Sequence, residues 1–327
     1  MSPTGAPRLA SRPPYSALSE IGDGSGARHA WDYFGRHDEL GTVHFIDKEA
    51  VLRARDAIRR GRRIALTLPQ DLPRPSLSVG RRPYEHHVEV RRSGRDDAVS
   101  SFYLQSSSQW DGLRHIRYKG VGYFGGRQES DLDDDEIGID RIAVQGIVSR
   151  GVLVDVPAFR ATRGQIVRCD TRDPVTVEEI EAVLSWEQVT VEPGDVLLLR
   201  TGWLGWYLQL DEKGRQRLQA TLHNGDGGLE CPGLESGVET AAWLWDHGIA
   251  AVAADNPAVE ALKVQRDQGF LHRFLIPLLG MPLGEFWQLE ELHMACSEAS
   301  QHTFLLSAQP LRLPRGAGSP SNAVAVL

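Results

Sequence analysis

Residues 146–156 read GIVSRGVLVDV, an apolar run that a short polar break interrupts. The valines and the length of the run predict a buried strand, with Asp155 at its exit. Two further apolar runs, VLLLR at 196–200 and IAAVAA at 249–254, repeat the pattern. Helical patterns alternate with these strands in the second half of the chain, whereas the first half is richer in strands. The sequence therefore predicts the α/β class, without the regular βαβ rhythm of a nucleotide-binding fold.

Other segments show helical or strand patterns of their own. Asp47 is a suitable N-cap for a helix over 47–60, whose apolar stripe would consist of Val51, Leu52 and Ile58. The remaining patterns predict helices over 175–185, 233–247 and 269–279, strands over 63–67, 88–92, 98–105 and 303–307, and a Gly/Pro tail over 315–327.

Composition and charge exclude several classes of partner. The 327 residues carry a net charge of -8 and no basic stripe, which argues against a nucleic-acid partner. Cys169, Cys231 and Cys296 are widely spaced, so neither a disulfide framework nor a zinc pattern is expected. Residues 1–26 predict a flexible N-terminal arm and lack the apolar core of a secretory signal. Because no apolar run reaches the roughly 18 residues of a membrane span, we expect a cytoplasmic protein with no membrane partner.

The stretch 104–126, LQSSSQWDGLRHIRYKGVGYFGG, concentrates polar residues that could carry chemistry. Gln109, Asp111 and His115 fall within seven positions, and Gln105 lies four residues before Gln109. Side chains alternate along an extended segment, so the two glutamines and the aspartate could share one face. An oxygen-rich shell with a histidine close by suits metal-assisted water chemistry. A polar strand end that caps neighbouring backbone groups explains the same residues equally well.

His272 and Glu285 are two further candidates in the C-terminal third of the chain. His272 has apolar neighbours on the helix predicted over 269–279, where a lone histidine is more often a satisfied core residue than a ligand. Glu285 lies among Leu283, Phe286 and Trp287. An ionised carboxylate in such surroundings needs a partner, because removing its water is costly.

Six segments share their order and spacing with one known family: SSSQWDGLRHIRYKGVGYFGG, RGVLVDV, GDVLLLRTGW, AADNPAVE, LHRFLIPLLGMPLGEFWQLEEL and GSPSNAVAVL. Together they resemble the cyclase family, the kynurenine formamidase-like metal hydrolases. The similarity runs from about Trp31 to the C-terminus and implies one catalytic domain over 27–327. The family fold implied for this domain is a β-rich mixed sheet with surrounding helices, assembled as a homodimer or homotetramer.

The resemblance also implies which residues form the site. The family pattern is H-x-G-T-H-x-D-x-P-x-H, in which the early histidines and the Asp bind metal and the last histidine transfers protons. A histidine and a glutamate further along the chain complete the family's site. The form QWDxLxH found here resembles a variant subgroup in which glutamine replaces the early histidines. In chain order, the corresponding residues of this sequence are Gln105, Gln109, Asp111, His115, His272 and Glu285.

The glutamines affect which metal the site would prefer. An amide oxygen is a poorer zinc ligand than imidazole, so the exchange favours Mn²⁺ or Mg²⁺ relative to Zn²⁺. Asp111 and Glu285 balance the charge of one divalent ion. We therefore expect Gln109, Asp111, His272 and Glu285 to hold a single cation, Mn²⁺ or Zn²⁺ with Mg²⁺ as a further candidate. The alternative is that no metal binds and that Gln109, Asp111 and His115 act as a hydrogen-bonding and acid-base set.

The resemblance implies a hydrolase that cleaves an amide or lactone bond in a small cyclic or aromatic substrate, with His115 as general acid and base. Two alternatives remain open: a non-hydrolytic cyclase or dehydratase-like enzyme, and a catalytically inactive protein that binds a small molecule. Aromatic side chains near the motifs could form the pocket wall, although core packing explains them equally well. The residues expected to contact substrate are Gln105, Trp110, Tyr118, Tyr123, Phe124 and Trp203.

Overall fold

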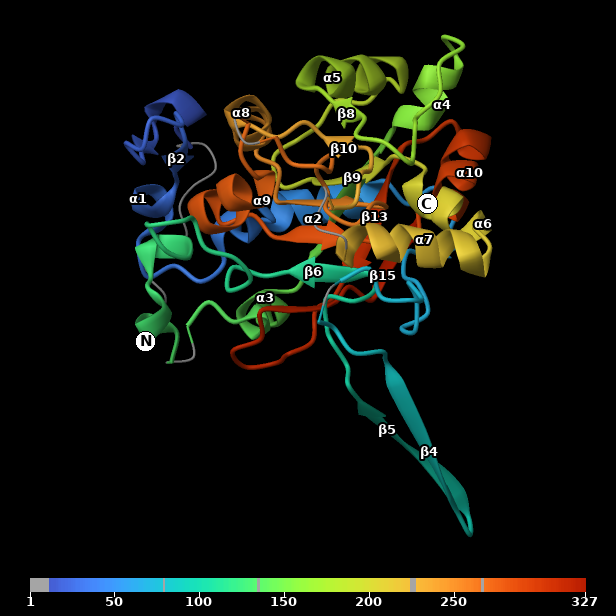
Figure 1. Ribbon diagram of the computed structural model, residues 1–327. Coiled ribbons are helices and arrows are strands. Elements are labelled where there is room, and N and C mark those ends of the chain that lie inside the picture. Colours follow the sequence, from blue (N-terminus) through green and yellow to red (C-terminus); the bar gives the residue numbers. More distant parts are fainter. Residues whose placement is uncertain (1–11, 79, 134–135, 224–227, 266–267) are drawn as a thin grey trace.

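A computed structural model of the chain describes residues 12–78, 80–133, 136–223, 228–265 and 268–327. One nine-stranded mixed sheet forms its centre, in the order β14-β6-β12-β11-β9-β7-β13-β15-β3. Helices surround this sheet, so the predicted mixed α/β domain is confirmed (Figure 1). The strands of the sheet are β3 (Arg63–Ala65), β6 (Gln109–Asp111), β7 (Val148–Asp155), β9 (Val196–Arg200), β11 (Ala251–Ala254), β12 (Leu283–Glu285), β13 (Thr303–Ala308), β14 (Gly318–Pro320) and β15 (Ala323–Val326).

The helices are mostly short, and Figure 1 shows α5 and α8 on one side of the sheet and α3 on the other. Helix α5 contacts both β7 and α8. Within the described residues, no helix is long and apolar enough to cross a membrane. The helices are α1 (Trp31–Phe34), α2 (Lys48–Asp56), α3 (Ile139–Gln145), α4 (Val156–Ala161), α5 (Val177–Trp186), α6 (Trp203–Gln209), α7 (Glu212–His223), α8 (Val238–Asp246), α9 (Leu271–Phe274) and α10 (Glu290–Ala299).

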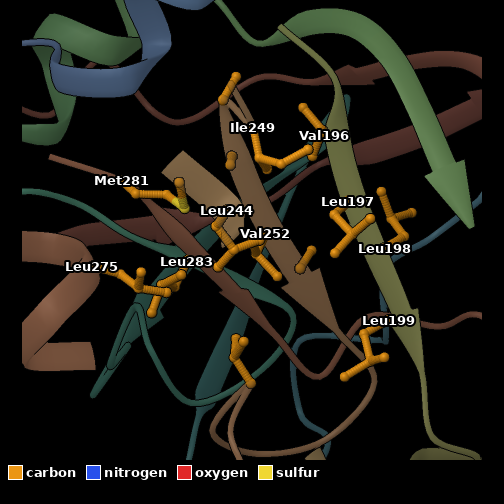
Figure 2. Close-up of a cluster of buried hydrophobic side chains, with 14 of the residues drawn as sticks. Val196, Leu197, Leu198, Leu199, Leu244, Ile249, Val252, Leu275, Met281 and Leu283 are labelled. Carbon is orange, nitrogen blue, oxygen red and sulfur yellow. The ribbon is translucent and has the colours of Figure 1, made fainter. Parts of the chain in front are cut away.

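The core lies around four neighbouring parallel strands, β12, β11, β9 and β7. Parallel strands that are covered on both faces are continuously apolar, which is why β9 could be recognised from its sequence. Every residue of β9 is buried. Figure 2 shows Leu197 of β9 near Val252 of β11 and Leu244 of α8, with Leu283 of β12 on the far side of β11. This packing fixes β12, which carries Glu285, against the centre of the sheet.

Helix α2 shows one correct and one wrong detail of the sequence prediction. Asp47 is its N-cap, and its side chain accepts a hydrogen bond from the amide of Ala50. The predicted stripe is wrong, because Val51, Leu52 and Ile58 are exposed whereas Ala50 is fully buried. The helix contacts β7 and β13. Small alanines let its backbone approach these strands closely, so the larger side chains face outward.

The strands β4 (Glu85–Arg91) and β5 (Gly94–Ser100) form a hairpin that projects from the body of the protein (Figure 1). All of its side chains are exposed. The two predicted strands are therefore present as a pair, but the second ends at Ser100 and does not extend to Gln105. Ser101 follows with a positive φ of 51°, a conformation that turns the chain away from the ladder. The segment before β6 is a loop.

The C-terminal end of the chain is more ordered than the sequence suggested. The predicted Gly/Pro tail over 315–327 is wrong, because it forms β14 and β15 of the central sheet, and the alternation of small and apolar residues buries Ala323 and Ala325. The predicted arm over 1–26 lies partly outside the described residues, which begin at 12. Within 12–26, Tyr15 and Leu18 are buried and the amide of Tyr15 donates to Asp246 at the end of α8, at 2.6 Å, whereas most of the other residues are exposed.

Three two-stranded ladders complete the described structure. Besides the hairpin, they are formed by β1 (Ser19–Glu20) with β2 (Arg28–His29), and by β8 (Pro174–Val175) with β10 (Gly233–Leu234).

Candidate active site

Strands β6 and β12 place three polar side chains on one face of the sheet. In their antiparallel register Glu285 pairs with Gln109, and Asp111 lies two residues further along β6. Paired residues and residues two apart point to the same face. Gln109 Nε2 donates a hydrogen bond to Glu285 Oε2. All three side chains are buried, so the shared face that the sequence suggested for Gln109 and Asp111 lies inside the protein.

His272 reaches this face from α9. The helix predicted over 269–279 is α9 followed by one π-helical turn over Leu275–Leu279, and His272 lies at its start. His272 Nε2 is 3.1 Å from Glu285 Oε1 and 3.7 Å from Asp111 Oδ2. One potential ligand atom from each of these three residues lies within 4.8 Å of the other two. Two distant segments of the chain thus form one buried polar cluster.

The cluster has the donor atoms that a divalent cation requires. Both carboxylate oxygens of Asp111 and the Oε1 of Gln109 are buried and make no hydrogen bond within the described residues. Burial acts to raise the pKa of Asp111, but His115, His272 and Arg81 outweigh it and lower this pKa. The carboxylate is therefore charged while its lone pairs stay free. Two carboxylates, an imidazole and an amide oxygen suit Mn²⁺, Mg²⁺ or Zn²⁺, so these residues fit a metal.

Protons compete with a metal for the same atoms. Burial would lower the pKa of His272, but the carboxylates of Glu260, Asp111 and Glu285 raise it well above its usual value. Burial and the nearby charge of Asp111 raise the pKa of Glu285 to about 7. In the metal-free protein the carboxylates therefore keep His272 protonated. Metal binding must release these protons, so the affinity for the metal increases as the pH rises.

Glu260 is a buried partner of His272 that the sequence reasoning missed. It is fully buried, its Oε2 lies 2.7 Å from His272 Nδ1, and its Oε1 accepts from the His272 amide at 3.3 Å. Because a carboxylate can only accept, Nδ1 carries the proton, and Nε2 points to Asp111 and Glu285. A partner of this kind fixes the tautomer and orientation of a metal-binding histidine. The signal was present in AADNPAVE, where Glu260 follows a run of small and apolar residues.

Glu260→Gln is expected to lower metal affinity by about 10- to 100-fold, because an amide orients the imidazole less strongly than a carboxylate does. Titration of the metal-free protein with Mn²⁺ measures the change. Glu298→Gln, at an exposed glutamate that pairs with Arg62, is the matched control and should bind Mn²⁺ like the wild type. Equal affinity in Glu260→Gln and the wild type would show that Glu260 does not position His272.

His115 lies at the more open side of the cluster, with 25% of its side chain exposed. Its Nδ1 is 3.5 Å from Asp111 Oδ1 and 3.3 Å from Gln105 Nε2. The rings of His115 and His272 have centroids 6.5 Å apart. Burial lowers the pKa of His115, and the positive charges of His272 and Arg81 add to this effect against the opposing charge of Asp111. A neutral imidazole next to the cluster is suited to accept a proton.

The aromatic residues that were expected to contact substrate fall into two groups in the structure, one in the core and one nearer the surface. Trp110 points to the opposite face of β6 from Asp111 and packs against Trp287, and Phe124 and Trp203 are also fully buried in apolar clusters. Tyr118 and Tyr123 lie nearer the surface, where their hydroxyls donate to Asp23 and Glu129. The aromatic side chain that lies directly on the cluster is Phe270, which stacks on His272 at 4.7 Å between ring centroids.

Comparison with known families places this site in context. The model of the family described as "Putative cyclase" matches residues 43–261, which is more than half of the chain. The chain belongs to the cyclase family. The match includes Gln109, Asp111 and His115 of this cyclase, whereas His272 and Glu285 lie beyond its end. No curated protein matches the cyclase described here.

Solved structures share the fold of this cyclase. A crystal structure of a novel cyclase is 29% identical with a TM-score of 0.78, and the match covers 91% of this chain and 99% of that one. Isatin hydrolase A from Labrenzia aggregata, bound to benzyl benzoate, is 16% identical with a TM-score of 0.59, covering 83% and 94% of the two chains. Isatin hydrolase A from Ralstonia solanacearum is 17% identical with a TM-score of 0.57, covering 85% and 95%. These likenesses confirm the predicted family fold.

Proposed function

We propose that this cyclase is a metal-dependent hydrolase that cleaves an amide or lactone bond in a small cyclic or aromatic substrate. The observation that carries the proposal is the buried cluster of Asp111, His272 and Glu285, in which both oxygens of Asp111 lack a hydrogen-bond partner among the described residues. His115 lies beside this cluster and is partly accessible. The fold shared with the isatin hydrolases supports the same class of reaction.

In the proposed mechanism, Asp111, His272 and Glu285, with the free Oε1 of Gln109, hold one divalent cation: Mn²⁺ or Zn²⁺, or else Mg²⁺. Such a cation supplies Lewis acidity when bound, which polarises a carbonyl group and acidifies water. Asp111 Oδ1 lies 3.5 Å from the Nδ1 of His115, and in this mechanism the His115 imidazole accepts the proton of the attacking water. His115 then returns this proton to the leaving nitrogen or oxygen, as a general acid.

Removal of the metal with a chelator is expected to abolish hydrolysis, and Mn²⁺ or Zn²⁺ should restore it at one ion per chain. The physical reason is that His115 alone cannot supply the charge stabilisation that a cation gives to a developing oxyanion. Elemental analysis gives the metal content. A panel of aromatic N-formyl amides, benzo-fused lactams and lactones gives the activity, with heat-treated protein as the control.

Each alternative function gives a different result in the same experiment. Turnover that persists in the metal-free protein would favour the metal-free acid-base set of Gln109, Asp111 and His115. A panel member that binds and is recovered chemically unchanged, with or without metal, would indicate a catalytically inactive binding protein. Conversion to a dehydrated or ring-closed product would indicate the non-hydrolytic enzyme.

We also propose, from the sequence and the family resemblance, that the enzyme is cytoplasmic and forms a homodimer or homotetramer. Light scattering of the purified protein measures the assembly directly.

A further inference from the structure

A cavity of about 290 Å³ is lined in part by Ser106, the residue that follows Gln105. Its wall consists of the loop 70–76, the segment 81–84 at the foot of the β4–β5 hairpin, Ser106 and Gln219. The volume is at the lower end of the range for small-molecule sites. Tyr84 contributes an aromatic ring to the wall and packs edge-on against Phe102, at 5.7 Å between ring centroids. The cavity is thus large enough for one small aromatic or cyclic molecule.

The cavity is strongly positive. Arg74, Arg81 and Arg82 line it, against the single acidic side chain of Asp71, and we call it the arginine cavity. Across the described ranges of the chain, none of these arginines forms an ion pair with a carboxylate. Guanidinium groups bind carboxylates through two parallel hydrogen bonds, and they bind most strongly where no other anion competes. Three guanidinium groups around one small space, none of them in a described ion pair with a carboxylate, are therefore suited to an anion.

Two contacts connect the arginine cavity to the catalytic residues. Arg81 donates a hydrogen bond to the backbone carbonyl of Gln105, whose side-chain Nε2 is 3.3 Å from His115 Nδ1. Arg81 is also close enough to act electrostatically on both Asp111 and His115. Ser106, the next residue along the chain, lines the cavity, and its buried hydroxyl has no hydrogen-bond partner within the described part of the protein. A ligand in the cavity could therefore bind this hydroxyl as well as the arginines.

We propose that the arginine cavity binds a carboxylate group of the substrate, so that the enzyme acts on small carboxylate-bearing amides or lactones. This inference rests on the proposed function and names its substrate class. The metal cluster contains the carboxylates of Asp111, Glu260 and Glu285, which repel an anion that approaches without a counter-charge. In this proposal the arginines hold the anionic end of the substrate, and its neutral carbonyl faces the cluster. Arg81 and Arg82 are thus specificity-determining residues.

Titration of the metal-loaded enzyme with benzoate and with benzamide, its neutral analogue of the same shape, tests the proposal. Benzoate is expected to bind about tenfold or more tightly than benzamide, as charge-assisted hydrogen bonds predict. The double variant Arg81→Gln, Arg82→Gln should lose about tenfold or more of its benzoate affinity and keep its benzamide affinity. Arg82→Lys keeps the positive charge but lacks the planar guanidinium group that binds a carboxylate through two hydrogen bonds. Its benzoate affinity should therefore lie between that of the wild type and that of the double variant.

The controls separate this cavity from other sites. Arg92→Gln removes an exposed arginine from the tip of the hairpin and should leave benzoate binding unchanged. Because Arg81 contacts the backbone, Arg82→Gln alone is measured too, and circular dichroism checks that each variant is folded. Equal affinities for benzoate and benzamide would overturn the proposal. A second result would also overturn it: Asp111→Asn loses benzoate binding while the arginine variants keep it. Benzoate would then bind at the metal and not in the arginine cavity.

Two further outcomes separate this inference from the function on which it rests. Inorganic phosphate that displaces benzoate at a lower concentration would show that the cavity recognises a phosphate, and it would overturn the carboxylate class. The titration needs no turnover, so selectivity for benzoate supports the cavity whether or not hydrolysis depends on metal. Metal-dependent hydrolysis without selectivity for benzoate would overturn only the substrate class.

Discussion

Asp111→Asn is expected to lower kcat/KM by about a thousandfold or more, because several kcal/mol of transition-state stabilisation depend on the metal. The substitution keeps the shape of the side chain but removes the negative charge of a residue whose two oxygens accept no hydrogen bond from the described residues. Asp111 lies between His272 and His115 and contacts both. Its loss should therefore remove the cation and the residue that orients the catalytic base at the same time.

The thermal stability of Asp111→Asn provides a readout that does not depend on activity. A ligand present at about 100 times its Kd stabilises a protein by roughly 2.7 kcal/mol, so Mn²⁺ should raise the Tm of the wild type but not that of the variant. Asp96→Asn, on the exposed hairpin, should keep the wild-type shift. If Mn²⁺ raised the Tm of Asp111→Asn as much as that of the wild type, the cation would be held elsewhere.

His115→Ala is expected to lower kcat by about 100- to 10,000-fold while the metal content stays at the wild-type level. The reason is that His115 contacts Asp111 but is not a member of the cluster formed by Asp111, His272 and Glu285. Steady-state kinetics and elemental analysis of the same preparation measure the two quantities together. A loss of activity that came with a loss of metal would make His115 a ligand and not the base.

His86→Ala is the control for this variant, since His86 is an exposed histidine of the hairpin. It should have the kcat of the wild type. If the kcat of His115→Ala stayed within a few-fold of the wild type, a different group would have to accept the proton of water.

The central strands could be predicted from the sequence, but the strand that carries the site could not. Strand β9 and the segment Val152–Val154 of β7 are buried on both faces and are therefore apolar. Strand β6 has only three residues, Gln109–Asp111, and its neighbours β12 and β14 lie far away in the chain. Its existence depends on long-range pairing, which local patterns do not encode. The same reason explains why the strands β14 and β15 within the Gly/Pro tail could not be predicted.

The candidate site could be found only in part. The resemblance supplied residues such as Asp111, His272 and Glu285, and the structure brings these three within 4.8 Å of one another. Glu260 was missed because its role depends on the position of His272, twelve residues further along the chain. Trp110 shows the opposite error. Its proximity to Asp111 in sequence suggested a pocket wall, but alternation along β6 turns it into the core.

The pairing of β6 with β12 has a consequence for how the enzyme is made on the ribosome. Gln109 and Glu285 are 176 positions apart, so at about 5 to 20 residues per second the first waits roughly 10 to 35 s for the second to be translated. Throughout that interval residues 109–111 lack both of the strands with which they pair in the folded protein. Strand β14 is translated later still, and it pairs with β6 on the side opposite to β12. Maturation of the catalytic centre is therefore among the last events of biosynthesis.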